Sequence, residues 1–132
     1  QSDLVEHCIA AINGQLDSQQ TSWDSRPAVG IVLAAGGYPN AYNKGDTISG
    51  LPELGSSASN VSTSEKIFHA GTQQIDANIG TNGGRVLCAT AMGNSVLDAQ
   101  QQAYQLASSI SWEGMFFRAD IAWRAIEREQ KN

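Results

Sequence analysis

The chain has 132 residues, of which 41% are hydrophobic and 16% charged, values typical of one globular domain with a core. The net charge of −5, with only 8 Lys and Arg residues, disfavours a nucleic-acid partner, which would require a basic stripe that neutralises successive phosphates. The longest strongly apolar run, 28–35, is far shorter than the roughly 20 residues that cross a bilayer, so we expect a soluble protein with no membrane partner. Two cysteines without motif spacing indicate no disulfide framework, which favours a reducing cytoplasm.

Residues 3–13 are predicted to form an amphipathic helix. The apolar residues of this segment recur at helical spacing, Asp3 is placed to cap the first turn, and Gly14 follows the last one. The chain opens with Gln1 and the helical pattern begins almost at once, which we interpret as a piece of a longer polypeptide.

Several strands are predicted after a polar connector, whose Trp23 is expected to dock on the core. Residues 28–35 (AVGIVLAA) form a short, continuous apolar run, which favours a strand buried on both faces. Further short strands are predicted at 47–49 and 66–70. The clearest strand is predicted at 86–92, where side chains alternate between two faces that both look at least half covered.

Two helices are predicted after the last strand. Residues 96–110 keep their apolar side chains on one stripe, and Asn94 or Ser95 is placed to cap this helix. A third helix is predicted at 118–129. The low-complexity polar segment 55–64 is predicted to be a mobile surface loop. Strands followed by helices predict an α+β fold with a small, mostly antiparallel sheet or partial barrel.

Two glycine pairs, Gly36 with Gly37 and Gly83 with Gly84, are the first candidates for a binding site. Glycine admits positive φ and lets backbone N–H groups converge on an anion, and the guanidinium of Arg85 next to the second pair matches a phosphate. Neither pair has the spacing of a dinucleotide or Walker motif. A plain turn therefore stays the alternative interpretation, because glycines often serve turn geometry alone.

Other polar residues give weaker signals. The loop of Lys44 is either a solvated turn or a substrate-facing loop above the first glycine pair. His69 alternates with apolar neighbours, which favours a hydrogen-bonded structural histidine over a catalytic base. Cys8 and Cys88 lie among apolar residues without motif spacing, so we expect buried thiols and no zinc site. Four aromatic residues are expected in core packing: Trp112, Phe116, Phe117 and Trp123.

Five blocks of sequence, taken in order, resemble the C-terminal domain of the phosphoribosylamine–glycine ligase family, also called glycinamide ribonucleotide synthetases. The resemblance covers essentially the whole chain. It implies that 1–26 are the end of an ATP-grasp region with a connector, and that 27–132 are the ligase C-terminal domain, a small barrel-sandwich-like β structure with flanking helices. The blocks are AVGIVLAAGGYP (28–39), KGDTISGLP (44–52), IFHAGT (67–72), TNGGRVLC (81–88) and DIAWRAIERE (120–129).

The resemblance implies an ATP-dependent ligase of de novo purine biosynthesis that joins glycine to 5-phosphoribosylamine and forms glycinamide ribonucleotide. In this family the glycine carboxylate is activated as an acyl phosphate, which the amine then attacks, and Mg²⁺ offsets the phosphate charge. ATP and Mg²⁺ are bound mainly by the ATP-grasp part that precedes this chain. We therefore expect no catalytic and no metal-binding residue here, and no activity of this chain alone. Monomer and dimer both stay open.

The expected contribution of this chain is one wall of the phosphoribosyl site. Departures from the family pattern include Ala119, where Lys is common, and Ala122, where Gly is common. The alternative is a stand-alone module that binds a small anion or a partner without catalysis, in which Arg85 forms a structural ion pair. A carrier domain with a modified lysine is the least favoured interpretation. The implied substrate-binding residues are Arg85, Gly84, Gly83, Asn82, Gly36, Gly37 and Lys44.

Overall fold

The computed structural model describes residues 1–52 and 64–131, so the loop predicted at 55–64 lies, except for Ser64, outside the described residues. The described part is α+β with antiparallel strand pairing, as predicted. Its elements, in chain order, are α1 (Leu4–Ile12), the 3-10 turn η1 (Leu16–Ser18), β1 (Ala28–Ala34), β2 (Glu65–His69), β3 (Thr72–Ile75), β4 (Asn78–Thr81), β5 (Arg85–Met92), α2 (Val96–Ser108) and α3 (Trp123–Glu129).

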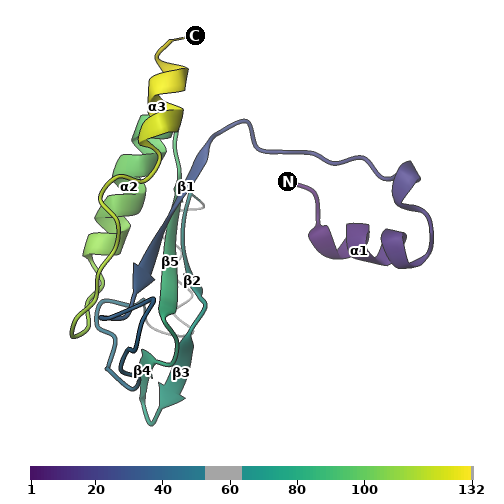
Figure 1. The fold of residues 1–132 in the computed structure, drawn as a ribbon. Helices are drawn as coiled ribbons and strands as arrows, with labels where there is room; N and C mark the ends of the chain where they lie inside the picture. The colour runs from purple at the N-terminus through teal and green to yellow at the C-terminus, as the bar shows by residue number, and fades with distance from the viewer. Residues whose placement is uncertain (53–63, 132) are drawn as a thin grey trace.

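Three of the strands form one antiparallel sheet in the order β1-β5-β2, with β5 in the centre (Figure 1). Ala28 of β1 pairs with Met92 of β5, and the register continues to a bulge between Leu33 and Ala34. The strands β3 and β4 form a separate hairpin at one end of this sheet. The hairpin was not predicted, because its residues are mostly polar and show no apolar alternation.

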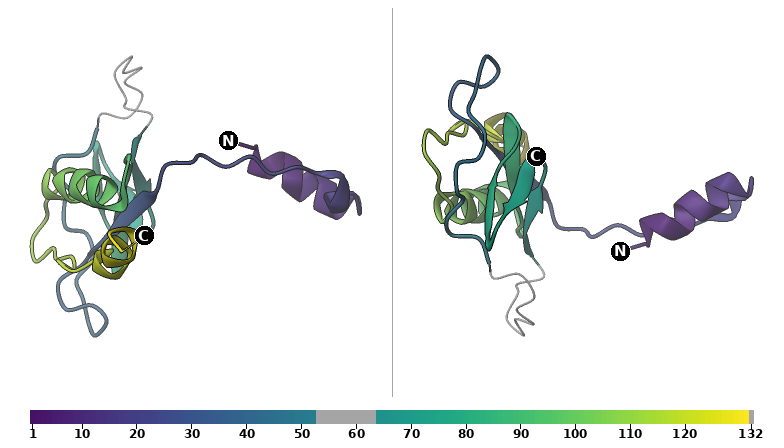
Figure 2. Two further views of the ribbon diagram at one scale, coloured as in Figure 1. Left: turned by 90° about the horizontal axis from the view of Figure 1, so that it is seen from above. Right: turned by 90° about the horizontal axis from the view of Figure 1, so that it is seen from below.

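The core lies between one face of the three-stranded sheet and α2 (Figures 1 and 2). Three alanines recur every four residues along α2 and are fully buried, and their small side chains let the helix approach the sheet closely. The sheet contributes larger apolar side chains from β1 and β5. The fully buried residues of this interface are Ile31, Leu33, Leu87, Ala89, Ala91, Ala99, Ala103 and Ala107.

The opposite face of the sheet is open, so the prediction that the 28–35 strand is buried on both faces is wrong. Burial alternates along β1 because α2 covers only one face. Val32 and Phe68 are 43% and 53% exposed, and both are in register with Cys88 of the central strand. These three residues therefore form an apolar row across the open face.

The helix α1 begins where the sequence predicts, with Asp3 accepting a hydrogen bond from the N–H of Val5 at 2.8 Å. It lies away from the sheet at the end of an extended segment (Figures 1 and 2). Two predictions fail for this reason, since no core lies near either side chain: Cys8 is exposed, and Trp23 is 81% exposed. The large apolar residues of α1 and η1 are exposed as well, whereas Ala10 is buried; the exposed ones are Leu4, Val5, Ile9, Ile12 and Leu16.

The third helix begins at Trp123, five residues later than predicted. Ala122 has a φ of +67°, a left-handed conformation that a helix does not contain. The preceding residues form a loop in which the guanidinium of Arg118 is paired with Asp120 and the hydroxyl of Tyr104 donates to the carbonyl of Arg118 at 2.7 Å. The helical pattern in the sequence therefore begins five residues before the helix itself.

The C-terminal helix stabilises the start of α2. The carboxylate of Glu129 accepts a hydrogen bond from the N–H of Val96, with N–O distances of 2.9 and 3.2 Å. Ser95 caps the same helix by accepting from the N–H of Asp98, as the sequence predicts. Together these contacts satisfy N–H groups that lack a partner within the helix.

Other predictions for single residues have mixed outcomes. Trp112 is buried and Phe117 is partly buried, as expected of core packing, but Phe116 and Trp123 are 42% and 45% exposed. His69 is hydrogen-bonded through Nδ1 to the hydroxyl of Thr72 at 3.0 Å, as expected of a structural histidine. In place of the strand predicted at 47–49, the structure has isolated β-bridges at Thr47 and Ser49.

Within the described ranges, no helix is long and apolar enough to cross a membrane.

Candidate functional site

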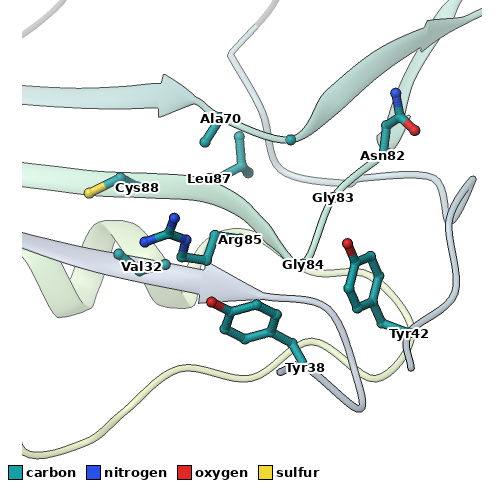
Figure 3. A pocket seen from close by; sticks show the side chains of 11 residues that line it. Val32, Tyr38, Tyr42, Ala70, Asn82, Gly83, Gly84, Arg85, Leu87 and Cys88 are labelled. Carbon is teal, nitrogen blue, oxygen red and sulfur yellow. The ribbon is translucent and has the colours of Figure 1, made fainter. Parts of the chain in front are cut away.

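A cleft of about 540 Å³ lies at the start of β5, where the turn between β4 and β5 meets the loop that follows β1 (Figure 3). Its volume is within the range of roughly 300–1,000 Å³ that is typical of small-molecule sites. The walls combine apolar side chains with a few polar groups. We call this site the Arg85 cleft; it is lined by Val32, Tyr38, Tyr42, Ala70, Gly71, Asn82, Gly83, Gly84, Arg85, Leu87 and Cys88.

Glycine is required where the turn crosses the chain that leads into β3. The N–H of Asn82 donates to the carbonyl of Gly71 at 2.7 Å, which holds the two segments together. A Cβ atom on Gly71 would lie 2.9 Å from the Cα atom of Gly83, closer than side-chain atoms pack. The backbone of the turn is therefore fixed by a contact that only glycine permits.

Two tyrosine rings pack against Gly84. A Cβ atom at this position would lie 2.7 Å from Cε2 of Tyr38 and 3.0 Å from Cε1 of Tyr42. The ring centroids are 6.2 Å apart and the planes are tilted by 60°. The carbonyl of Gly84 accepts a hydrogen bond from the N–H of Ala35 at 2.9 Å, which ties the turn to the end of β1. The sequence thus places an aromatic wall beside the glycine turn.

The electrostatics of the cleft favour an anion. Arg85 is exposed, and its guanidinium has no hydrogen bond or ion pair with any residue that the structure describes. No carboxylate is found among the described residues that line the cleft. The loop hydrogen bonds of the described chain do not use the N–H groups of Gly83 and Gly84 as donors. A guanidinium and unpaired backbone N–H groups are the donors that bind phosphate in proteins.

The structure brings four of the seven predicted site residues together in the Arg85 cleft: Asn82, Gly83, Gly84 and Arg85. Gly36 lines a second cavity of about 310 Å³, and Gly37 and Lys44 line neither cavity. Gly37 has a φ of +93° and turns the chain immediately before Tyr38.

The loop that carries Lys44 is held against the end of β4, and Lys44 itself is exposed to solvent. The N–H of Gly45 donates to the carbonyl of Thr81 at 2.7 Å, and the N–H of Thr81 donates to the carbonyl of Asp46 at 3.0 Å. The hydroxyl of Thr81 accepts a further hydrogen bond from the N–H of Asp46. The loop is therefore well ordered, and its cation does not line the Arg85 cleft.

Tyr38 and Tyr42 are the site residues that the sequence analysis missed. Each is partly buried, and each lies in the loop directly after the first glycine pair. The sequence does contain one sign of this role, because Tyr38 directly follows a glycine pair in a loop. Many binding sites place a rigid aromatic side chain on such a loop. Their contact with Gly84 joins segments more than 40 residues apart.

The described residues do not fit a magnesium centre. The Arg85 cleft contains no carboxylate, and the second cavity has two, on Asp46 and Glu113. No group of three or more His, Cys, Asp and Glu side chains that could hold a metal ion is found in the part of the chain that the structure describes.

Fold and site together define an α+β domain with a cleft that is lined by a guanidinium, a glycine turn and two tyrosines and contains no carboxylate among its described residues. The family model described as "Phosphoribosylglycinamide synthetase, C domain" matches residues 28–124, and the chain belongs to this family. This membership confirms the resemblance found in the sequence.

Curated relatives give the same assignment over nearly the whole chain. A phosphoribosylamine–glycine ligase of Vibrio parahaemolyticus is 61% identical over 131 residues, which are 99% of this chain and 29% of that protein. The ligase of Salmonella typhimurium is 53% identical over 130 residues, which are 98% of this chain and again 29% of the relative. The chain thus spans less than a third of the length of these relatives.

A crystal structure of phosphoribosylamine–glycine ligase from Thermotoga maritima is similar in fold. The TM-score is 0.66 at 34% sequence identity, and the match covers 87% of this chain and 27% of that one. The arrangement of the antiparallel sheet and its helices is therefore one that a solved member of the family shares.

Proposed function

We propose that this chain is the C-terminal part of an ATP-dependent ligase that joins glycine to 5-phosphoribosylamine, and that the Arg85 cleft binds the phosphoribosyl group of that substrate. The family membership and the names of the relatives support the reaction. ATP, Mg²⁺ and glycine would be bound mainly by the part of the relatives that this chain does not match, and the chain alone would then be inactive.

The unpaired guanidinium of Arg85 carries the proposal for the cleft. A phosphate placed there would meet a planar cation and the free N–H groups of the Gly83–Gly84 turn, with no carboxylate of the lining to repel it. The alternative role of Arg85, a structural ion pair, has no support in the described part of the chain, because no carboxylate there is paired with it.

The exposed face of α1 supports a division of the chain near residue 26. Ile12 and Leu4 are 85% and 73% exposed, although the spacing of the apolar residues is that of a helix that packs on a core. We propose that residues 1–26 belong to the ATP-grasp region of the full-length ligase, which would cover this face. Residues 27–132 would form the C-terminal domain, with the sheet and the β3–β4 hairpin as parts of a barrel-sandwich-like β structure in a cytoplasmic enzyme.

The test compares Arg85→Ala with Lys44→Ala in the full-length ligase. Both changes remove one positive charge, but only Arg85 lines the cleft. A hydrogen bond to a charged group contributes about 1.5–3 kcal/mol, so Arg85→Ala should raise the KM for phosphoribosylamine roughly 10- to 100-fold. The KM values for glycine and ATP should stay within about twofold, since neither is proposed to bind in this cleft.

Lys44→Ala should leave all three KM values nearly unchanged, which separates a contact in the cleft from a general effect of charge. An unchanged KM for phosphoribosylamine in the Arg85→Ala enzyme would show that the cleft does not hold the phosphate. An equal rise in both variants would assign the effect to the field of the whole protein.

A further inference from the structure

The hydroxyl groups of Tyr38 and Tyr42 have no hydrogen-bond partner among the residues that the structure describes, although both rings form the wall of the Arg85 cleft. Tyr104 shows the contrast. Its hydroxyl donates to the carbonyl of Arg118 at 2.7 Å and accepts from the N–H of Ile121 at 3.0 Å, outside the cleft. The hydroxyls in the cleft are therefore free for a ligand.

The two hydroxyls lie at different places along the cleft. The rings are tilted by 60°, and Figure 3 shows the hydroxyl of Tyr38 on the side of Arg85 and that of Tyr42 on the side of the glycine turn. Both rings pack against Gly84, which supports one side of each ring. This support favours the observed positions of the hydroxyls before a ligand binds.

A bare phosphate does not require these groups. It accepts hydrogen bonds, and Arg85 with the N–H groups of the turn already supplies donors. A tyrosine hydroxyl both donates and accepts, which matches the hydroxyl of a sugar, since that group also does both. The aromatic rings add an apolar surface against which the carbon atoms of a sugar can pack.

We propose that Tyr38 and Tyr42 bind the pentose of the substrate and make the Arg85 cleft specific for a sugar phosphate over a bare phosphate. This inference rests on the proposed function, in which Arg85 holds the phosphate. It adds two specificity-determining residues, from a loop that the chain places more than 40 residues before Arg85.

The experiment measures two competitive inhibitors of phosphoribosylamine in the full-length ligase, ribose 5-phosphate and inorganic phosphate. Competition against this substrate restricts the measurement to its own site. The variants are Tyr38→Phe and Tyr42→Phe, singly and together, with Tyr104→Phe as the matched control and Arg85→Ala as the test of the phosphate contact. Each change to Phe keeps the ring and removes only the hydroxyl.

One neutral hydrogen bond corresponds to roughly a fivefold change in an equilibrium constant. The Ki of ribose 5-phosphate should therefore rise about fivefold in each single variant and about 20-fold in the double variant. The Ki of inorganic phosphate should stay unchanged in all three. Tyr104→Phe should leave both Ki values unchanged, whatever it does to thermal stability.

Two outcomes would overturn the inference. The Ki of ribose 5-phosphate could stay unchanged in the double variant, or both inhibitors could weaken equally, which would assign the tyrosines to the phosphate. Arg85→Ala distinguishes this failure from that of the proposed function. If Arg85→Ala weakens both inhibitors while the tyrosine variants weaken neither, the phosphate contact stands and the sugar contact falls.

Discussion

Replacement of Gly84 by Ala should displace the aromatic wall of the Arg85 cleft. The added methyl group would come closest to Cδ2 of Tyr38, and it would lie 2.7 Å from Cε2 of Tyr38 and 3.0 Å from Cε1 of Tyr42. Non-bonded carbon atoms prefer about 3.5–4.0 Å, so the ring of Tyr42 must retreat by roughly 0.5–1 Å and that of Tyr38 by more than about 1 Å. Tyr38 is only partly buried and can turn outward, which keeps the cost near the lower end of the 1–3 kcal/mol range of overpacking, at about 1 kcal/mol.

For a chain of this size, a loss of about 1 kcal/mol lowers Tm by about 4 °C. The Ki of ribose 5-phosphate in the full-length ligase should rise by about as much as in the Tyr38→Phe and Tyr42→Phe double variant, roughly 20-fold, because a hydroxyl displaced by 1 Å loses its hydrogen bond. Thermal unfolding of the 132-residue chain and competitive inhibition of the ligase measure the two effects.

Gly45→Ala is the control for the added methyl group. Gly45 has a φ of +93°, and no atom lies within 4 Å of the position that a Cβ atom would take, so alanine there strains the backbone without touching the tyrosines. Its Tm should fall by a similar amount while the Ki stays unchanged. An unchanged Ki in Gly84→Ala, with the rings in their original positions in a structure of the variant, would refute the reasoning.

Two further predictions concern contacts outside the cleft. Glu129→Ala removes the acceptor for the N–H of Val96, so it should cost about 1 kcal/mol and lower Tm by several degrees. The control is Glu127→Ala, which changes an exposed glutamate that accepts no such hydrogen bond from the residues that the structure describes and should leave Tm unchanged. Equal Tm values for the two variants in thermal scans would contradict the capping role. The hydrogen bond from the Arg26 guanidinium holds the pKa of Asp24 well below its usual value. The pair therefore stabilises the fold at pH values above the unfolded pKa of about 4, and this stabilisation is lost as the pH falls from there toward the lowered pKa of the folded state. Thermal scans from pH 6 to pH 2 should therefore show a shallower loss of Tm for Asp24→Asn, and parallel curves would argue against the pair.

Side-chain periodicity correctly predicted the elements that pack along one face over their whole length. The alanine stripe of α2 repeats over the length of the helix, and the alternation in β5 persists because one of its faces is fully covered. The prediction failed for burial of β1, since an apolar run does not reveal which face a helix covers. Val32 is apolar and lies on the face that α2 leaves open.

The start of α3 was not predictable from periodicity, because a single left-handed residue interrupts the pattern without changing its composition. Ala122 adopts a φ of +67°, a conformation that glycine favours and that an alanine in the sequence does not indicate.

The candidate site was predictable where its residues are neighbours in the chain. Arg85 and the Gly83–Gly84 turn form one local pattern, and they lie together in the cleft. Tyr38 and Tyr42 reach the same cleft only through tertiary packing on Gly84, which no local pattern contains. The first glycine pair illustrates the same limit, because Gly36 lines a different cavity from the tyrosine that follows two residues later.

The order of strands in the sheet also determines when it can form during synthesis. The first and second strands to leave the ribosome, β1 and β2, occupy the two edges and do not pair with each other. Among the strands that the structure describes, both pair with β5 and not with each other, so this sheet has no hydrogen-bonded strand pair until residues 85–92 have been made. The β3–β4 hairpin is local and is free of this delay. A nascent chain that lacks β5 therefore holds two unpaired strands, the apolar β1 and the more polar β2, and the sheet can close only after β5 has left the ribosome.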